Sequence, residues 1–289
     1  MENIGFLRSR ESVTHLSAPH PLFRVEATLS PYAGCSMGCV YCPFSFDTKT
    51  NVKTDFLFNL DHKLSASAAP LHLGLGAVCE PYCEHEKEFN VTRNSIELVV
   101  SRGFPMQVFT KSPLVLRDTD IMKEHSAKGL LAASVSLMTL DQGIAEIFEP
   151  FAIPSKERVE LIGELNKKGI FAGAVLAPII PYISDAPEQL EAVFEQVKKA
   201  GGQYLLPSAF CAGSTAVFDN LKAVILRSFP NILHRIDNLY ENARFPVVTY
   251  AGRVNDLLQD LSAKYELPIS LPTEKDKGIP VDIRQELLK

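Results

Sequence analysis

Apolar residues follow two alternating patterns over much of the chain, and each pattern predicts a different element. Short apolar or alternating runs bounded by turn residues predict β-strands. Six such runs lie at residues 23–29, 71–78, 105–110, 130–137, 170–179 and 203–210. Helical patterns separate most of these runs, and this alternation predicts a parallel α/β sheet, closed or partly closed as a barrel. In such a barrel, reactive groups lie at the C-terminal ends of the strands.

Three of the intervening helices carry clear end signals. A polar residue suited to an N-terminal cap precedes each apolar repeat, and a glycine follows its last turn. The predicted capping or start residues are Thr92, Ser155 and Asp185. Pro187 adds a further start signal in the first turn of the third helix. These signals place helices after the second, fourth and fifth predicted strands.

The alternation ends at about residue 213, where mostly helical patterns begin. We therefore predict three parts: an N-terminal extension over residues 1–22, a partial barrel over 23–212, and a helical C-terminal region with a tail over 213–289. The final segment, residues 268–289, is polar and contains prolines, so we expect it to lie along the surface.

Charge and composition narrow the class of protein. The chain has 289 residues and a net charge of −5, without a Lys/Arg block, which disfavours a duplex DNA partner. No signal-peptide pattern opens the sequence, and the longest apolar stretch, 170–183, is too short for a bilayer. We therefore expect a cytoplasmic protein without membrane contact. Six cysteines in that reducing compartment indicate metal binding or catalysis rather than disulfides.

Three of the cysteines stand in the stretch GCSMGCVYCP, directly after the first predicted strand. Cys35, Cys39 and Cys42 have the spacing Cys-x3-Cys-x2-Cys. Thiolates are the usual ligands of iron–sulfur clusters, and three of them leave one iron of a four-iron cubane open to a small molecule. A structural zinc site with a fourth ligand from Cys79, Cys83 or a histidine is one alternative. Three inert core thiols are another, although a glycine-containing loop does not favour them.

With Tyr41 as the aromatic residue before the last cysteine, the motif resembles that of the radical S-adenosylmethionine enzymes. Within that superfamily, the segments LSPYAGCSMGCVYC, FTKSPLVLRDTDIM, ASVSLMTLD and GAVLAPIIPYISD resemble the spore photoproduct lyase-like group. The resemblance implies a partial (β/α)6 barrel of TIM type with a helical C-terminal extension. It also implies that Cys35, Cys39 and Cys42 hold a [4Fe-4S] cluster whose open iron binds S-adenosylmethionine (SAM).

The resemblance further implies a reaction. One-electron reduction by a partner such as flavodoxin or ferredoxin would cleave SAM to methionine and a 5′-deoxyadenosyl radical, which takes a hydrogen atom from a substrate. The substrate is unassigned, and a lyase-like activity is expected. The cofactor would supply the reactive chemistry, while the protein positions it and excludes water.

The resemblance assigns cofactor contacts to residues at strand ends. Tyr41 would pack near the adenine, Glu80 would contact the methionyl amine, and Lys111 would pair with the methionyl carboxylate. Ser134 and Ser136 alternate with apolar neighbours and so share one strand face, from which they would hydrogen-bond the ribose. The residue pattern alone also allows a solvated Glu80 and Lys111, and two serines satisfied inside the barrel core.

Cys79 and Cys83 follow the second predicted strand, and three interpretations stay open for them. Either or both are hydrogen donors that face the substrate, and the resemblance favours Cys79, which matches the donor cysteine of spore photoproduct lyases. Together with His85 or Cys211 they would instead form a second metal centre. The third interpretation makes them small buried apolar residues.

Three hypotheses of function follow. The first is a radical SAM enzyme with an unassigned substrate. The second specifies repair of a thymine-dimer lesion in DNA with Cys79 as hydrogen donor, and the acidic net charge disfavours it. The third is a non-catalytic scaffold whose cysteine loop holds zinc. A cluster protein would be brown and sensitive to oxygen, whereas a zinc protein would be colourless and stable in air.

Overall fold

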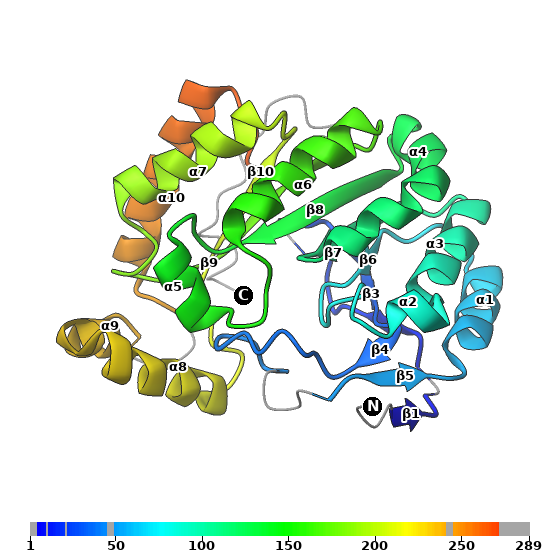
Figure 1. Cartoon of the computed structure of the whole chain (residues 1–289), viewed down its shortest axis with the longest axis horizontal. Coiled ribbons are helices and arrows are strands. Elements are labelled where there is room, and N and C mark those ends of the chain that lie inside the picture. The colour runs from blue at the N-terminus through cyan, green and yellow to red at the C-terminus, as the bar shows by residue number, and fades with distance from the viewer. Residues whose placement is uncertain (1–4, 10, 21, 45–48, 241–244, 272–289) are drawn as a thin grey trace.

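A curved sheet of seven strands forms the centre of the molecule (Figure 1). The structure is a computed structural model that describes residues 5–9, 11–20, 22–44, 49–240 and 245–271. In spatial order the strands are β10 (Leu205–Ala209), β9 (Ala172–Ile179), β8 (Leu131–Leu137), β7 (Met106–Thr110), β6 (Leu73–Leu75), β3 (Ala27–Leu29) and β2 (Val13–His15). Only β2 runs antiparallel to its neighbour. The six parallel strands coincide with the six predicted runs, so the predicted partial α/β barrel is confirmed.

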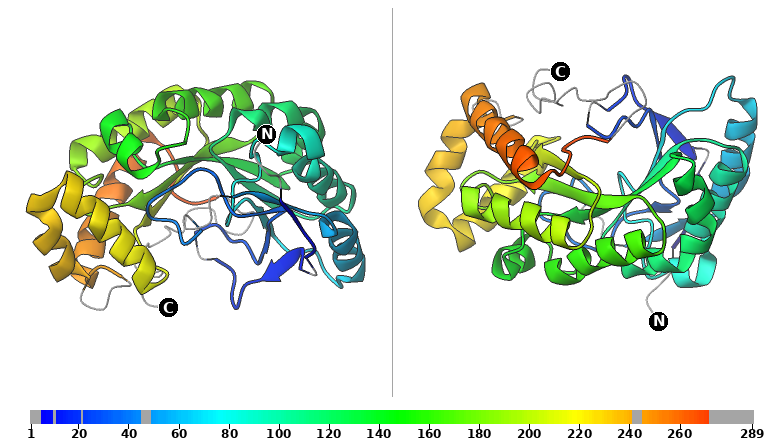
Figure 2. Two further views of the ribbon diagram at one scale, coloured as in Figure 1. Left: turned by 60° about the horizontal axis from the view of Figure 1, so that its bottom comes forward. Right: turned by 90° about the horizontal axis from the view of Figure 1, so that it is seen from above.

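Helices cover the outer face of this sheet (Figure 2). The longer ones are α1 (Phe56–Ala66), α3 (Val91–Ser101), α4 (Thr119–Ala127), α6 (Ser155–Lys167), α7 (Pro187–Lys199) and α10 (Val248–Tyr265). Shorter elements follow the strands directly: α2 (Glu86–Phe89), the 3-10 helix η1 (Pro113–Asp118) and α5 (Gln142–Phe148). Because parallel strands need crossover connections, each of these strands returns through a helix on the same side of the sheet.

The central strands are buried on both faces. Helices cover one face, and the other face lines the barrel interior, so both faces carry apolar side chains. In β8, Ala133 and Val135 belong to the main core beneath the helices. Ala132 belongs to a second cluster on the inner face, with Val175 of β9 and Leu206 of β10. Successive side chains point to opposite faces of a strand, so a strand buried on both sides gives a nearly continuous apolar run.

The predicted caps of α3 and α6 are wrong by one or two residues. Asn90 is the N-cap residue of α3, and Thr92 lies inside the helix. The buried carboxylate of Glu86 accepts hydrogen bonds from the Thr92 and Arg93 backbone N–H groups at 2.8 and 3.1 Å, and Arg117 contacts it at 2.6 Å. A side chain from the preceding helix therefore satisfies the N–H groups that a local cap would have taken.

In α6 the cap position belongs to Pro154, and Ser155 is the first helical residue. In α7 it belongs to Ala186, and the preceding Asp185 ties two segments together instead. Its carboxylate accepts hydrogen bonds from the Tyr182 backbone N–H at 2.7 Å and from the Tyr250 hydroxyl at 3.0 Å.

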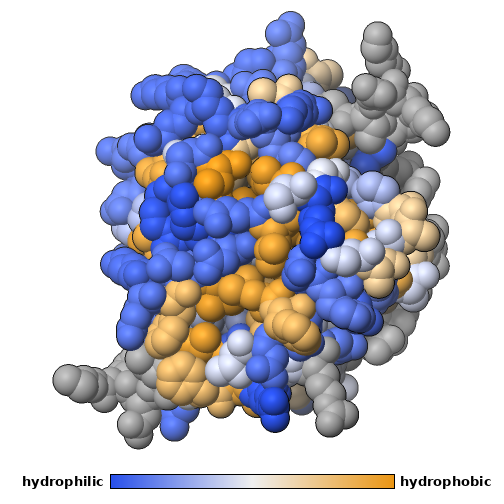
Figure 3. All heavy atoms as spheres, turned by 90° about the vertical axis from the view of Figure 1, so that its right-hand side faces the viewer, coloured by the Kyte–Doolittle hydropathy of each residue, from blue (hydrophilic) through white to orange (hydrophobic). Residues whose placement is uncertain are grey.

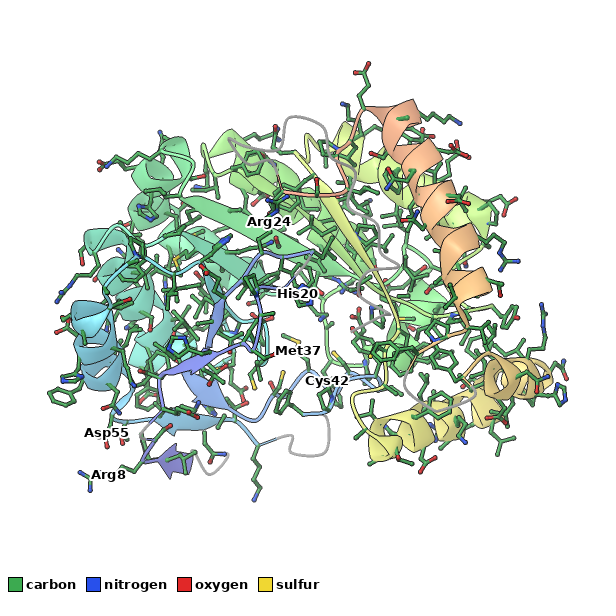
Figure 4. All side chains as sticks on the ribbon, turned by 180° about the vertical axis from the view of Figure 1, so that it is seen from behind. Arg8, His20, Arg24, Met37, Cys42 and Asp55 are labelled. Atoms are coloured by element: carbon green, nitrogen blue, oxygen red, sulfur yellow. The ribbon has the colours of Figure 1, made fainter. Side chains whose placement is uncertain are left out.

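The segment predicted as an N-terminal extension supplies strands to two sheets. β2 borders the main sheet, whereas β1 (Gly5–Leu7) pairs with β5 (Asn51–Lys53), which also pairs with β4 (Tyr32–Ala33). Arg8 and Asp55 form an ion pair of 2.9 Å at the outer edge of this small sheet (Figure 4). β4 precedes the cysteine loop and β5 follows it, so the small sheet holds both ends of that part of the chain together.

The C-terminal region is helical, as its pattern predicts. α8 (Thr215–Ser228), the 3-10 helix η2 (Pro230–Ile232) and α9 (Leu233–Leu239) pack at the end of the molecule near α5 (Figure 1). α10 returns to the barrel and packs on α7, where Lys264 and Tyr265 both contact Glu191. The predicted tail is described as far as Leu271, whose side chain is buried on the inner face of the sheet. Residues 272–289 lie outside the described residues.

Polar and charged side chains cover most of the face over α1, α3 and α4, with apolar atoms exposed between them (Figure 3). Phe6 of β1 and Phe58 of α1 are 61% and 78% exposed. In the described part of the chain, no helix has the length and apolar character needed to cross a lipid bilayer.

Gly173 of β9 offers a test of the packing between β9 and β10. A Cβ atom at this position would lie 2.3 Å from the Tyr204 backbone oxygen, so Gly173→Ala is expected to lower the free energy of unfolding by about 1–3 kcal/mol. The matched control is Gly252→Ala in α10, where nothing lies within 4 Å of the added atom. The free energy of unfolding of this control variant is expected to rise by about 0.5–1 kcal/mol, because alanine is favoured over glycine inside a helix. Denaturant unfolding measures both, and equal effects of the two substitutions would contradict the packing.

Candidate cofactor site

The three-cysteine loop, residues 34–42, follows β4 and is shaped by two glycines. Gly34 and Gly38 have φ values of 79° and 63°, in the left-handed region that glycine adopts without steric cost. Cys39 is buried, and Cys35 and Cys42 are partly exposed. The Cys42 backbone N–H donates to the Cys39 carbonyl at 3.0 Å. The loop therefore folds back on itself between its second and third cysteines.

Residues 148–151, which begin at the last residue of α5, hold this loop from outside. The Val40 N–H donates to the Phe148 carbonyl at 2.9 Å, and the Tyr41 hydroxyl donates to the Glu149 carboxylate. A Cβ atom on Gly38 would lie 2.8 Å from the Phe151 ring, and the positive φ at this position adds to the preference for glycine. On its other side, the Asn220 side chain of α8 donates to the Val40 carbonyl at 2.8 Å. The barrel and the C-terminal helices therefore both fix the cysteine loop.

A cavity of about 330 Å³ lies beside the loop, at the C-terminal ends of the parallel strands. Its lining includes most of the sequence-predicted site residues: Cys35, Cys39, Tyr41, Cys42, Cys79, Glu80, Lys111 and Ser136. Cys42 and its neighbour Met37 lie at the central opening of the molecule (Figure 4). The fold therefore brings together side chains from the cysteine loop and from the ends of β6, β7 and β8.

Two predicted site residues lie outside this cavity lining. Ser134 is fully buried, and its hydroxyl bonds to Gln107 at 2.6 Å and to the Tyr204 hydroxyl at 2.8 Å. It shares the inner face of β8 with Ser136, as the alternation predicts, but lies one layer deeper in the barrel. Cys83 lines a separate hollow of about 1080 Å³, which meets the cavity at Met37. The ribose contact predicted for Ser134 stays a prediction, and the Ser134 side chain does not line the cavity.

Glu80 joins the end of β6 to the end of β7. Its carboxylate accepts hydrogen bonds from the Lys111 backbone N–H at 2.9 Å, the Tyr82 N–H at 3.0 Å and the Thr110 hydroxyl at 2.5 Å. Burial raises the pKa of Glu80 above its ordinary value, although these three donors and the Lys111 charge oppose the rise. Glu80 is thus a fixed hydrogen-bond acceptor on the cavity wall.

Lys111 ends β7 and faces a buried carboxylate that the sequence analysis did not single out. Its Nζ lies 3.6 Å from Glu149 Oε1, and Arg158 Nη1 lies 2.7 Å from Glu149 Oε2. Burial alone would raise the pKa of Glu149, but Lys111, Arg158 and the Tyr41 hydroxyl together hold it below its ordinary value. Burial opposes the charge on Lys111, yet its neighbours, the Glu149 carboxylate among them, raise its pKa above the ordinary value. Both groups are therefore charged at neutral pH.

No local motif marks Glu149, but a signal for Arg158 is present in the sequence. Arg158 lies four residues before Ile162 and seven before Leu165, on the face of α6 that is buried. A charged residue at such a position needs a buried partner, because an unpaired charge inside a protein is costly. The identity of that partner, from the loop before the helix, becomes visible only in the structure.

Cys79 and Cys83 are both buried thiols but face different spaces. Cys79 lines the cavity with the three loop cysteines, whereas Cys83 lines the hollow together with His85 and Lys87. Burial raises the pKa of each thiol to about 12, so both keep their protons at neutral pH. Cys211 lines the same cavity as Cys79. The structure therefore places these two cysteines, which lie four residues apart in the sequence, in different cavities.

The donor set of the loop fits a cubane cluster. Within the described residues, no group of three or more His, Cys, Asp or Glu side chains converges so that it could hold one ion. In a [4Fe-4S] cluster each thiolate binds a different iron, so the thiols are spread around the cluster. Three thiols on one loop that line one cavity fit that arrangement.

Comparisons with known proteins find the same fold elsewhere. No family model matches the chain. An uncharacterized protein of Mycobacterium tuberculosis is 25% identical over 255 residues, which are 83% of this chain and 74% of the relative. The radical SAM Nalpha-GlyT isomerase of Pseudomonas phage M6 is 20% identical over 217 residues, 72% of this chain and 44% of the isomerase. A spore photoproduct lyase variant with bound AdoMet and dinucleoside spore photoproduct superposes with a TM-score of 0.69. It is 14% identical, with 92% of this chain and 80% of the lyase covered.

These likenesses show the fold, which is the α/β barrel found in spore photoproduct lyase. The structural neighbour has AdoMet and dinucleoside spore photoproduct bound, and the phage relative is named as a radical SAM isomerase. They leave the substrate and the cluster chemistry unassigned.

The burial of the cysteines predicts an order of chemical modification. In the cluster-free protein at pH 8, iodoacetamide is expected to modify the exposed Cys211 well before Cys83, which is 3% exposed. The Cys83 rate is expected to rise about tenfold per pH unit, because the thiolate fraction grows until the pH reaches the raised pKa of about 12. Mass spectrometry of digested samples measures both rates. Equal rates, or a Cys83 rate that levels off near pH 9, would contradict this assignment.

Proposed function

We propose that the protein is a radical SAM enzyme in which Cys35, Cys39 and Cys42 hold a [4Fe-4S] cluster. One observation carries this proposal: the three-cysteine loop shares its cavity with Tyr41 and Lys111, at the C-terminal ends of the parallel strands. The fold of the AdoMet-bound structural neighbour supports it. When bound, the cluster and SAM would supply a hydrogen-abstracting 5′-deoxyadenosyl radical, given an electron from a donor such as flavodoxin or ferredoxin.

The protein's own residues would bind and orient SAM. The Lys111 ammonium is 15% exposed at the cavity and pairs with the methionyl carboxylate through charge-assisted hydrogen bonds. Glu80, on the next strand end, accepts from the methionyl amine. Tyr41 lies along the wall near the adenine, and Ser136 is the remaining candidate for the ribose. Each of these residues comes from a different segment, so binding depends on the register of the strands.

Apolar side chains would keep water from the reacting atoms. Phe23, Phe109, Val175 and Phe210 line the same cavity between the polar groups. Phe23 and Phe109 contact each other edge to face, with ring centroids 5.0 Å apart. A reactive radical needs such surroundings, because water and stray hydrogen donors would otherwise divert it.

We place the hydrogen donor, where the reaction needs one, at Cys79 rather than Cys83. Cys79 faces the cavity, and burial keeps its sulfur protonated. In the donor step the S–H bond breaks homolytically, the hydrogen atom forms a C–H bond with the product radical, and the unpaired electron stays on sulfur. The position of Cys79 also favours the more specific alternative, repair of a thymine-dimer lesion in DNA. The net charge of −5 argues against that alternative, because DNA binding requires positive charge.

Cluster assembly tests the proposed class directly. Anaerobic reconstitution with iron and sulfide is expected to give about four irons per chain, and the EPR signal of the reduced protein should change when SAM is added. The triple variant Cys35→Ala/Cys39→Ala/Cys42→Ala should bind no cluster, because all three ligands are lost. The matched control Cys79→Ala/Cys83→Ala should keep about four irons.

One outcome of that experiment would contradict the proposed class, and another would contradict the donor assignment. Zinc without iron in the purified protein would favour the scaffold hypothesis instead. About eight irons in the wild type, falling to about four in the Cys79→Ala/Cys83→Ala control, would indicate a second cluster and exclude Cys79 as a donor.

The donor role of Cys79 predicts an asymmetry between two single variants. With dinucleoside spore photoproduct as the probe, Cys79→Ala is expected to cleave SAM but to lose repaired product by more than about tenfold. Cys83→Ala, the matched control, should retain both. Chromatography of 5′-deoxyadenosine and of thymidine products measures the two steps separately. A wild type that cleaves SAM and leaves this probe intact would exclude lesion repair, while the radical SAM proposal would stand.

A further inference from the structure

A group of buried charges lies behind Lys111, which itself lines the cavity. Glu149 lies at its centre, because its two carboxylate oxygens face Lys111 and Tyr41 on one side and Arg158 on the other. The side chains of Glu149 and Arg158 are 0% and 1% exposed. A buried charge is costly unless it is paired, so each of these ions depends on the others.

The two cations of this group have different roles. Arg158 uses both terminal nitrogens within the protein: besides the 2.7 Å ion pair with Glu149, it donates to the Ser136 carbonyl at 2.9 Å and to the Ser155 hydroxyl at 3.2 Å. Lys111 lies 3.6 Å from Glu149, which is too long for a hydrogen bond. Glu149 therefore attracts the Lys111 ammonium without using its N–H groups, which stay available to a ligand in the cavity.

Glu149 also connects the segments that form the cavity. Tyr41 belongs to the cysteine loop, Lys111 to the end of β7, and Arg158 to α6, and Arg158 in turn holds the end of β8 at Ser136. The adjacent Phe148 carbonyl holds the same loop through Val40. One carboxylate thus fixes the relative positions of the loop that would hold the cluster and the lysine that would hold the ligand.

We propose that Glu149, anchored by Arg158, is a positioning residue that directs the Lys111 ammonium and the Tyr41 ring toward a carboxylate-bearing ligand. This inference rests on the proposed SAM site and deepens it. Its consequence is selective: removing the Glu149 charge should weaken recognition of the carboxylate of the ligand much more than recognition of its nucleoside.

Two ligands that differ only in the carboxylate test this selectivity. SAM and decarboxylated SAM are titrated by calorimetry into the reconstituted protein with its cluster oxidised, so that no turnover occurs. In Glu149→Gln, the affinity for SAM is expected to fall on the order of tenfold, and that for decarboxylated SAM by less than about twofold. Glu146→Gln is the matched control, because Glu146 is an exposed carboxylate on α5 and contacts only Gln142 among the described residues at 3.0 Å.

A second variant keeps the test decisive if Glu149→Gln does not fold. Glu149→Gln/Arg158→Met removes the two opposite charges of the fully buried pair together, a change that proteins often tolerate better than the loss of one partner alone. Its thermal unfolding is followed beside the titration. The same selective loss of SAM affinity in this variant supports the proposal.

Three results would overturn the inference, and the third would also overturn the proposed SAM site. Unchanged affinities for both ligands in Glu149→Gln, or an equal fold loss for both, would leave Glu149 without a role in recognition of the carboxylate. A wild type that takes up its cluster but binds neither ligand would overturn the proposed SAM site together with this inference. The first two results leave the proposed function intact, so the two failures are distinguishable.

Discussion

The attachment of the cysteine loop to residues 148–151 is the constraint on which the rest of the site depends. Val40, Tyr41 and Gly38 each meet a different part of that segment, through a backbone hydrogen bond, a side-chain hydrogen bond and a close packing contact. A loop with two glycines has little conformational preference of its own, so outside contacts must set its shape. Because those contacts come from the chain between β8 and α6, the barrel has to be formed before the three thiols face one cavity.

The parallel sheet supplies the other half of the site. Strands β6, β7 and β8 end side by side, which brings Glu80, Lys111 and Ser136 to the same cavity from widely separated sequence positions. Their outer faces are held by the apolar core under the helices, and that core fixes the register. The polar groups are thus placed by apolar packing, and the buried pair of Glu149 and Arg158 adjusts them locally.

The elements most accurately predicted from the sequence are those that a local pattern determines. Apolar runs located all six parallel strands, and the cysteine spacing located the loop. Helix starts were less accurate, because the N-terminus of α3 is satisfied by Glu86 from another helix. Ser134 and Ser136 share a face, as alternation requires, but their depth in the barrel depends on Tyr204, seventy residues away. Glu149 carries no local signal, since its role arises from partners on three other segments.

The central claim is that three thiolates leave one iron open at the cavity, and Mössbauer spectroscopy of the reconstituted protein tests it most directly. Without SAM, the spectrum should show the four irons of a [4Fe-4S] cluster. Addition of SAM should shift the signal of about one quarter of the iron, because only the iron without a protein thiolate can take the ligand. A spectrum that SAM leaves unchanged, or one in which all the iron responds alike, would contradict the account.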